Sequence, residues 1–285
     1  MKKGLVLEGG AMRGLFTAGV TDVLMENGIE FDGIVGVSAG AAFGCNYKSK
    51  QIGRALRYNV NYCKDKRYCS FYSLLTTGNL FGADFCYREL PEKLDIFDEK
   101  TFFENPMEFY AVCTDVETGE PIYHKFDKKE TGYFEWFRAS ASLPLVSKIV
   151  EFGGKKMLDG GISDSIPLKF FESSGYDRNV IILTQPKGYR KNKNKLIPLM
   201  KVVFSKYPKL VEKMKLRHKE YNEISEYIEQ KEDKGEIFVL RPLEKLPIDR
   251  MENDPEILKE VYQIGRKTAE ENLDKLKIFL TKASV

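Results

Sequence analysis

The sequence predicts an α/β fold with a mainly parallel sheet, and three observations support this prediction. Two short apolar runs, residues 3–10 and 31–37, have the composition of buried strands. Each run leads through a glycine-rich turn into a segment whose apolar residues have helical spacing. A strand–helix–strand–helix order within about fifty residues is typical of βαβ units and therefore of a parallel sheet.

The first four elements follow from local signals. "KGLVLEGG" at residues 3–10 is a strand that ends at its glycine pair, and a helix is predicted over residues 14–28. "FDGIVGV" at residues 31–37 is the second strand. "AGAAFGCNYK" at residues 39–48 begins the second helix directly after Ser38.

The rest of the chain has strand signals in its middle and helical patterns at its end. Residues 51–99 are aromatic-rich and irregular, with short helices, and we expect them to form a cap over a site. The elements predicted after this segment are two strands around the "ETGE" turn in 108–126, a helix over 133–144 closed by Pro144, a hairpin in 148–161 with Gly153 and Gly154 at its tip, strands in 178–184 and 235–242, and helices over 208–231 and from Asp254 to the C-terminus.

The composition argues against several classes of protein. No apolar run approaches the ~18 residues of a membrane span, and the stretch before Gly9 is too short for a signal peptide. Five cysteines without a C-x-x-C pair indicate free thiols in a reducing compartment rather than a structural zinc site. Neither a D-x-D-x-D-G calcium loop nor an H-E-x-x-H zinc motif occurs. We expect a cytoplasmic protein without a metal or cofactor, a location compatible with peripheral contact at the inner face of a membrane.

A net charge of +3 hides a strongly basic segment. Residues 187–220 hold twelve Lys and Arg against Glu212 and Glu220, a charge of +10, so the other residues sum to −7. Such a block favours an anionic partner, either a phospholipid surface or a nucleic acid, but it also fits a solvated helix face beside a lysine-rich loop. Because the block contains the apolar insert "LIPLMKVVF", we expect Lys187–Lys219 to contact anionic lipid and expect no nucleic acid to bind.

"GVSAG", residues 36–40, has the G-x-S-x-G pattern of a nucleophile elbow. A tight strand-to-helix turn needs small flanking residues, which Gly36, Ala39 and Gly40 provide. The turn lifts the serine hydroxyl clear of the sheet at the positive end of the next helix. Ser38 is therefore the candidate nucleophile. The same pattern also occurs in ordinary tight turns whose serine caps a helix.

"EGGAMRG", residues 8–14, lies between the first strand and the first helix. Read as G-x-G-x-x-G, it predicts a dinucleotide site with Glu30 or Asp32 on the ribose, although Ala11 replaces the middle glycine. As an alternative, the N–H groups of Gly10 and Ala11 at a helix N-terminus form a hole for a developing oxyanion, a role that alanine can keep. Turns that follow adjacent parallel strands share one sheet edge, so this loop and the elbow can face the same ester.

The base that would activate the serine is not an obvious histidine. The chain holds His124, which neighbours Lys125, and His218, which lies in a highly charged helix, and neither suits a triad. A partly desolvated carboxylate can accept a serine proton instead. Asp159, at the end of a predicted hairpin strand, is the leading candidate. Its rivals are Asp164, Asp115 and Asp84, which also suit turn or surface roles.

Together these residues resemble the patatin-like phospholipase family. That family is marked by a D/E-G-G-G-x-R/K-G loop, a G-x-S-x-G elbow and a D-G-G/A motif, matched here by "EGGAMRG", "GVSAG" and "DGG" at residues 159–161. "RASASLP" at residues 138–144 and "CTDVETGEP" are similar to further segments of the family. The resemblance covers about residues 4–185. Ala11 in place of the third glycine and Ser165 in place of asparagine depart from the pattern.

The resemblance implies a three-layer α/β/α fold and cleavage of the fatty-acyl esters of lipids through a Ser38–Asp159 dyad and an acyl-enzyme, without a metal. Residues 1–185 would form the catalytic core, and residues 186–285 a basic, mostly helical part packed on the same domain. The residues expected to hold the oxyanion are Gly9, Gly10, Ala11 and Ala39, and Arg13 is expected to order the loop.

Two other classes of function fit the same sequence. A non-catalytic relative that binds a lipid or a protein partner could keep all three motifs. A dinucleotide-binding protein would use "EGGAMRG" alone.

Overall fold

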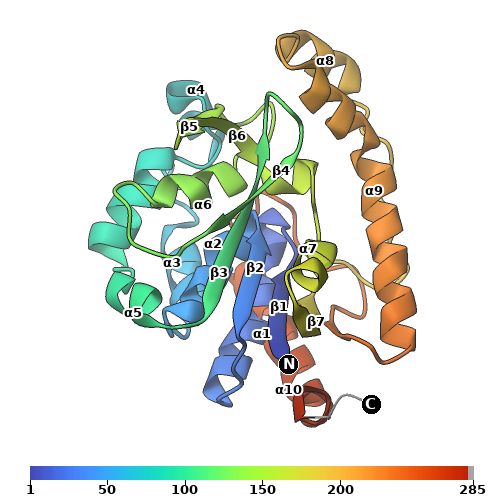
Figure 1. The fold of residues 1–285 in the computed structure, drawn as a ribbon. Coiled ribbons are helices and arrows are strands. Elements are labelled where there is room, and N and C mark those ends of the chain that lie inside the picture. The colour runs from blue at the N-terminus through green and yellow to red at the C-terminus, as the bar shows by residue number, and fades with distance from the viewer. Residues whose placement is uncertain (282–285) are drawn as a thin grey trace.

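The computed structural model describes residues 1–281 and shows a sheet between two layers of helices (Figure 1). Within these residues the strands are β1 Lys2–Leu7, β2 Gly33–Val37, β3 Glu108–Asp115, β4 Pro121–Lys125, β5 Val150–Phe152, β6 Lys155–Asp159, β7 Tyr176–Ile182 and β8 Phe238–Leu240. Hydrogen bonds connect them in the order β5-β6-β3-β2-β1-β7-β8, in which β2 and β6 pair with successive stretches of β3, and β4 also pairs with β3. The pairs that join β3, β2, β1, β7 and β8 are parallel. The predicted three-layer α/β fold with a mainly parallel sheet is confirmed.

The helices include the predicted ones and several short additions. They are α1 Gly14–Glu26, α2 Ala39–Lys48, α3 Arg54–Tyr62, α4 Phe71–Thr77, α5 Glu99–Glu104, α6 Phe134–Ser140, α7 Leu168–Ser173, α8 Ile197–Val203, α9 Pro208–Asp233 and α10 Pro255–Thr281, with the short turns η1 Ala11–Arg13 and η3 Gly160–Ile162 and the wider helix η2 Phe85–Leu94. The sequence does not predict α5, α7 and α8, because six or seven residues are too few to show a helical period. The helix predicted from Asp254 onward is confirmed as far as Thr281, and residues 282–285 lie outside the described part.

The two faces of the sheet are covered by different helices. Val6 and Val35 pack with residues of α7 and α9, whereas Leu5, Leu7 and Ile34 pack with residues of α1, α2 and α10. This alternation follows from the period of two in a strand, and burial on both faces explains the nearly continuous apolar runs.

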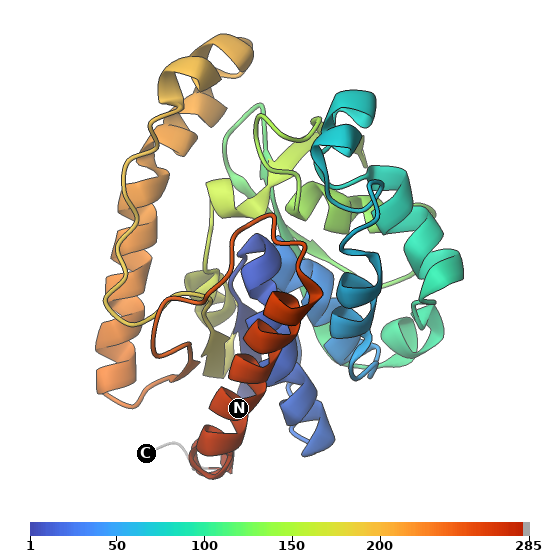
Figure 2. The same ribbon diagram turned by 180° about the vertical axis from the view of Figure 1, so that it is seen from behind.

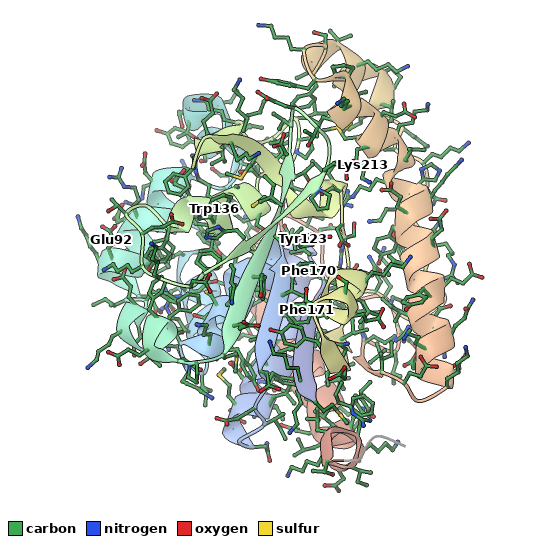
Figure 3. All side chains as sticks on the ribbon, in the orientation of Figure 1. Glu92, Tyr123, Trp136, Phe170, Phe171 and Lys213 are labelled. Carbon is green, nitrogen blue, oxygen red and sulfur yellow. The ribbon has the colours of Figure 1, made fainter. Side chains whose placement is uncertain are left out.

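The C-terminal helix packs closely on the first helix, and Figure 2 shows α10 and α1 side by side. Two glycines permit the approach: a Cβ on Gly19 would lie 2.1 Å from the carbonyl oxygen of Tyr262, and a Cβ on Gly265 would lie 2.1 Å from that of Phe16. On the opposite face of the sheet, the rings of Tyr123 and Phe170 stack with their centroids 3.8 Å apart and join β4 to α7 (Figure 3). No helix among residues 1–281 is long and apolar enough to cross a bilayer.

Candidate active site

Ser38 lies on the turn between β2 and α2, and its backbone is strained. Its φ of 55° and ψ of −122° lie outside the regions that non-glycine residues adopt readily. The turn is tight, since a Cβ on Gly36 would lie only 2.6 Å from the backbone nitrogen of Ala41. The Ser38 N–H donates to Ser140 Oγ at 2.9 Å, and the Ser140 hydroxyl donates to the carbonyl oxygen of Val112 at 2.6 Å. These contacts fix the strained turn on β3.

Asp159 lies close to Ser38 because two strands end against each other. On β3, Val112 pairs with Val37 of β2, and the next residue, Cys113, pairs with Asp159 of β6. Both β3 residues also pair with β4, which must therefore lie along the opposite edge. β2 and β6 consequently share one edge of β3, and their carboxyl ends meet between Val112 and Cys113. Ser38 follows directly from one of these ends, and Asp159 is the other.

The carboxyl group of Asp159 is buried and only partly hydrogen-bonded. Oδ1 accepts a hydrogen bond from the N–H of Gly161 at 2.8 Å, whereas Oδ2 has no partner of standard geometry among residues 1–281. Burial raises the pKa of Asp159, and the charge of Arg217 and the nearby hydroxyl of Ser38 oppose this effect. A buried carboxylate with a free oxygen beside a serine hydroxyl can accept the serine proton.

The glycine loop packs directly against the elbow. A Cβ on Gly9 would lie 2.8 Å from both the Cβ of Ser38 and the carbonyl oxygen of Val37, so only glycine fits there. Ala11 has a φ of 50°, a left-handed conformation that glycine adopts with less strain. The N–H groups without an acceptor in the described part of the chain include those of Gly9, Gly10, Ala11 and Ala39. Free donors of this kind can stabilise a developing oxyanion.

Glu8, at the start of the loop, is held from two sides. Its Oε2 accepts hydrogen bonds from the N–H of Thr184 at 2.6 Å and from Oγ1 of Thr184 at 3.0 Å. Its Oε1 accepts a hydrogen bond from the phenol of Tyr221 at 2.6 Å. Because Tyr221 belongs to α9, the C-terminal part of the chain supports the loop. Neither Thr184 nor Tyr221 lies in a motif, so no pattern in the sequence indicates that they contact Glu8, and Ser140 is marked only as part of "RASASLP".

Ser38 lies at the boundary of two pockets. The first has about 830 Å³ of empty space, part of it open to solvent, and apolar side chains dominate its wall. Its lining includes Met12, Phe43, Tyr58, Phe81, Leu90 and Phe134, several of them from the predicted cap over residues 51–99. The second has about 500 Å³ of empty space, also partly open to solvent, and its polar lining includes the glycine loop, Asp159 and Ser165. Ser38, Ala11 and Leu143 line both pockets, which therefore adjoin.

The polar pocket is rich in cationic side chains, which are those of Arg13, Lys191, Arg217 and Arg250. Nε of Arg13 is buried without a hydrogen-bond partner among the described residues, so the predicted loop-ordering role of Arg13 stays a prediction. Nε of Arg217 donates to the carbonyl oxygen of Gly161. Burial, and then the charge of Arg217, lower the pKa of Lys191 to about 7. The charge pattern of the sequence places Lys191 and Arg217 in a lipid-binding block, whereas in the fold they line the pocket that contains Ser38.

The rival residues lie elsewhere, and none of them lines either pocket. Among the aspartates, Asp164 accepts a hydrogen bond from the phenol of Tyr123, Asp115 forms a salt bridge with Lys155, and Asp84 forms one with Arg88. Of the histidines, His124 stacks on Trp136, and His218 contacts the carbonyl oxygen of Lys215. Of the residues proposed for a ribose, Glu30 pairs with Lys50 and Asp32 accepts from the N–H of Lys3. No cluster of His, Cys, Asp and Glu suited to a metal ion occurs among residues 1–281.

The family of this chain is shown by its match to models of known protein families. The model of the patatin-like phospholipase family matches residues 5–171, which is more than half of the chain. The chain belongs to the patatin-like phospholipase family. A second family model, a domain of unknown function called DUF6363, matches residues 207–281, which include α9 and α10.

Three individual proteins are similar to this chain over different shares of their length. The protein YjjU of Escherichia coli is 30% identical over 274 residues, which cover 92% of this chain and 74% of YjjU. The lysophospholipase NTE1 of Meyerozyma guilliermondii is 29% identical over 184 residues, 60% of this chain but only 12% of the fungal protein. The solved structure of VipD from Legionella pneumophila superimposes with a TM-score of 0.47 at 13% identity, covering 96% of this chain and 67% of VipD.

Proposed function

We propose that this patatin-like protein is a serine acyl hydrolase that cleaves a fatty-acyl ester of a lipid through Ser38 and Asp159. The observation that carries the proposal is the meeting of β2 and β6 on one edge of β3, which brings the elbow serine and a buried carboxylate together. Membership of a phospholipase family and the match to fungal lysophospholipases support lipid hydrolysis. The apolar pocket beside Ser38 suits an acyl chain.

The proposed reaction has two steps with balanced proton transfers. Asp159 accepts the proton of Ser38 while Oγ attacks the ester carbonyl, and the free N–H groups of the glycine loop and of Ala39 hold the oxyanion. Collapse of this intermediate breaks the ester bond, and the proton on Asp159 passes to the leaving alcohol. Asp159 then takes a proton from water, whose oxygen attacks the acyl-enzyme. The fatty acid leaves, and the proton returns to Ser38.

A fluorophosphonate probe tests the nucleophile directly. We expect the wild-type chain to be labelled and to hydrolyse p-nitrophenyl butyrate, and expect Ser38→Ala to lose both properties. Ser174→Ala, at an exposed serine, is the control and should keep them. Labelling of the Ser38→Ala chain at the wild-type rate would contradict the assignment of Ser38 as the nucleophile. A wild-type chain that is folded but neither labelled nor active would instead favour the non-catalytic relative that binds a lipid or a partner.

The role of Asp159 as the general base is tested by substituting it and, separately, a second largely buried aspartate. Asp159→Asn should lower kcat by about 10²–10⁴-fold, the range for loss of a positioned base. Asp164→Asn is the matched control, since Asp164 is largely buried and hydrogen-bonded to Tyr123 but lines neither pocket at Ser38. Equal losses in the two variants, with both chains folded, would remove Asp159 from the proposed role.

We also infer that α8 and the residues next to it contact an anionic membrane surface. Leu199, Val202 and Val203 are 49%, 73% and 55% exposed. The lysines around them, none of them in a salt bridge with a described residue, are Lys193, Lys195, Lys201, Lys206 and Lys209. Other basic residues of the block are neutralised, for example Lys187 by Asp233. Exposed apolar side chains inside a cationic rim are typical of an interfacial membrane contact.

The orientation of this surface supports the same contact. Figure 1 shows α8 and α4 at the end of the molecule toward which β1 and β2 run, the end that carries Ser38. Phe71 and Leu75 of α4 are also exposed, at 67% and 87%. Cosedimentation should show binding to phosphatidylglycerol vesicles and less to phosphatidylcholine vesicles. Leu199→Ser with Val202→Ser should weaken this binding, whereas Ile278→Ser, at an exposed apolar residue of α10, should not. Equal or absent binding to both lipids would leave a solvated face.

A further inference from the structure

We infer that Arg13, Lys191, Arg217 and Arg250 form a binding site for a phosphate group that carries no balancing cation, such as a phosphomonoester at one end of the substrate. The inference rests on the proposed function in one respect, because the phosphate would belong to the molecule whose ester Ser38 cleaves. The polar pocket that these side chains line adjoins the apolar pocket at Ser38, and none of the aromatic side chains that line the apolar pocket lines the polar one. An ester at Ser38 could thus place its acyl chain in one pocket and its phosphate in the other.

The charge of this pocket is uncompensated. None of the four cations makes a salt bridge with a carboxylate among residues 1–281, although Arg190, the neighbour of Lys191, pairs with Glu229. The acidic residues that line the pocket are Glu8 and Asp159. Both oxygens of Glu8 are occupied by Thr184 and Tyr221. With both acids ionised, the lining carries two positive charges in excess when Lys191 is protonated and one when it is neutral, so the pocket attracts an anion.

The site is built from separate elements rather than from one mobile segment. Arg13 comes from η1, Arg217 from α9, Lys191 from the loop after β7, and Arg250 from the loop before α10. The Lys191 loop is fixed to α9, since its N–H donates to Asn222 Oδ1 at 2.7 Å and its carbonyl oxygen accepts from Asn222 Nδ2 at 3.1 Å. Nζ of Lys191 lies 4.0 Å from the ring centroid of Tyr221.

Two further observations point to a ligand with acceptor oxygens. Nε of Arg13 is buried and donates to nothing among the described residues, a costly state that an anionic oxygen would relieve. Three guanidinium groups around one pocket provide the planar donor pairs that match phosphate geometry. A zwitterionic headgroup would bring its own cation into this positive field, so a phosphomonoester is favoured over phosphocholine.

The substrate arm of the test compares esters with the same acyl chain in the same neutral detergent micelles. We expect a higher kcat/KM for 1-acylglycerol 3-phosphate than for 1-acylglycerol or 1-acylglycerophosphocholine. Lys191→Gln and Arg250→Gln should each lower the phosphomonoester-to-neutral ratio of kcat/KM by about tenfold or more, as expected for a lost charged hydrogen bond. Lys245→Gln, exposed in the same loop as Arg250, is the control and should leave the ratio unchanged. An unchanged ratio in both test variants would overturn the inference.

The binding arm does not depend on catalysis. Calorimetry on the Ser38→Ala chain should detect inorganic phosphate and glycerol 3-phosphate but not glycerol, and Lys191→Gln in the same background should weaken both signals. Absence of phosphate binding would overturn the site. Phosphate binding without any preference among the esters would assign the site to free phosphate and overturn its role in substrate recognition. Phosphate binding in a chain that hydrolyses no ester would contradict the proposed function alone.

Discussion

The phenol of Tyr221 donates a 2.6 Å hydrogen bond to Oε1 of Glu8, across 213 positions of the sequence. The bond joins α9, in the segment matched by DUF6363, to the glycine loop of the patatin-like segment. The two family segments therefore meet at the candidate active site. The division into a core over residues 1–185 and a helical part over 186–285 stays a prediction, and β8 and α10 of the second part pack on the sheet and on α1.

Loss of this bond should destabilise the protein. Tyr221→Phe leaves Oε1 of the buried Glu8 without its donor, and we expect the free energy of unfolding to fall by about 1–3 kcal/mol. Tyr227→Phe is the matched control on the same helix, because its phenol donates to Glu172 at a less buried position, and it should cost less. Urea unfolding followed by circular dichroism measures both. Equal losses of unfolding free energy in the two variants would mean that the hydrogen bond to Glu8 stabilises the protein no more than the one to Glu172.

The charge of Arg217 should tune the proposed base. Burial raises the pKa of Asp159 and Arg217 is the strongest opposing charge, so Arg217→Gln should raise that pKa further. Because the base works only when deprotonated, the acid limb of kcat/KM for p-nitrophenyl butyrate should move to higher pH. Lys209→Gln, exposed on the same helix, should leave the limb in place. A lower rate with an unmoved limb would indicate a structural effect of Arg217 instead.

Replacement of both histidines should separate a dyad from a triad. Neither His124 nor His218 lines a pocket at Ser38, so His124→Gln with His218→Gln should retain most of the wild-type kcat for p-nitrophenyl butyrate. His124 stacks on Trp136, with ring centroids 3.9 Å apart, and its loss should lower stability. Thermal unfolding therefore accompanies the assay. A loss of turnover of more than about 10²-fold in a folded chain would argue for a histidine base.

Asp22 should make stability depend on pH in a defined direction. Burial raises its pKa to about 6, against hydrogen bonds from Tyr262 and the N–H of Gly53. A raised pKa means that the folded state binds the proton more tightly than the unfolded state does, so protonation of Asp22 stabilises the fold. This stabilisation is full below about pH 4 and is lost as the pH rises through about 6.

Asp22→Asn removes that contribution. The unfolding free energy of the variant should therefore rise relative to that of the wild type by roughly 3 kcal/mol between about pH 4 and 7. Urea unfolding of both chains at several pH values measures the difference. A difference that stays constant across this range would contradict the prediction.

The sequence by itself determined the class of fold and the candidate residues for chemistry. Apolar runs and glycine turns predicted β1, β2 and the hairpin of β5 and β6, because strand burial on both faces and left-handed turns leave local marks. G-x-S-x-G and D-G-G selected Ser38 and Asp159, since a tight elbow and a turn after a strand restrict residue type locally.

Only the tertiary structure decided how these residues meet and what surrounds them. The shared edge of β3 sets Asp159 beside the elbow, and strand pairing of this kind depends on partners far apart in the chain. The same holds for Tyr221 on Glu8 and for Lys191 and Arg217 in the polar pocket. In sequence these two cations belong to one basic run that favours a lipid surface. In the fold they line the pocket that contains Ser38. A charge pattern reflects only the composition along the chain, whereas a site requires residues to converge in space.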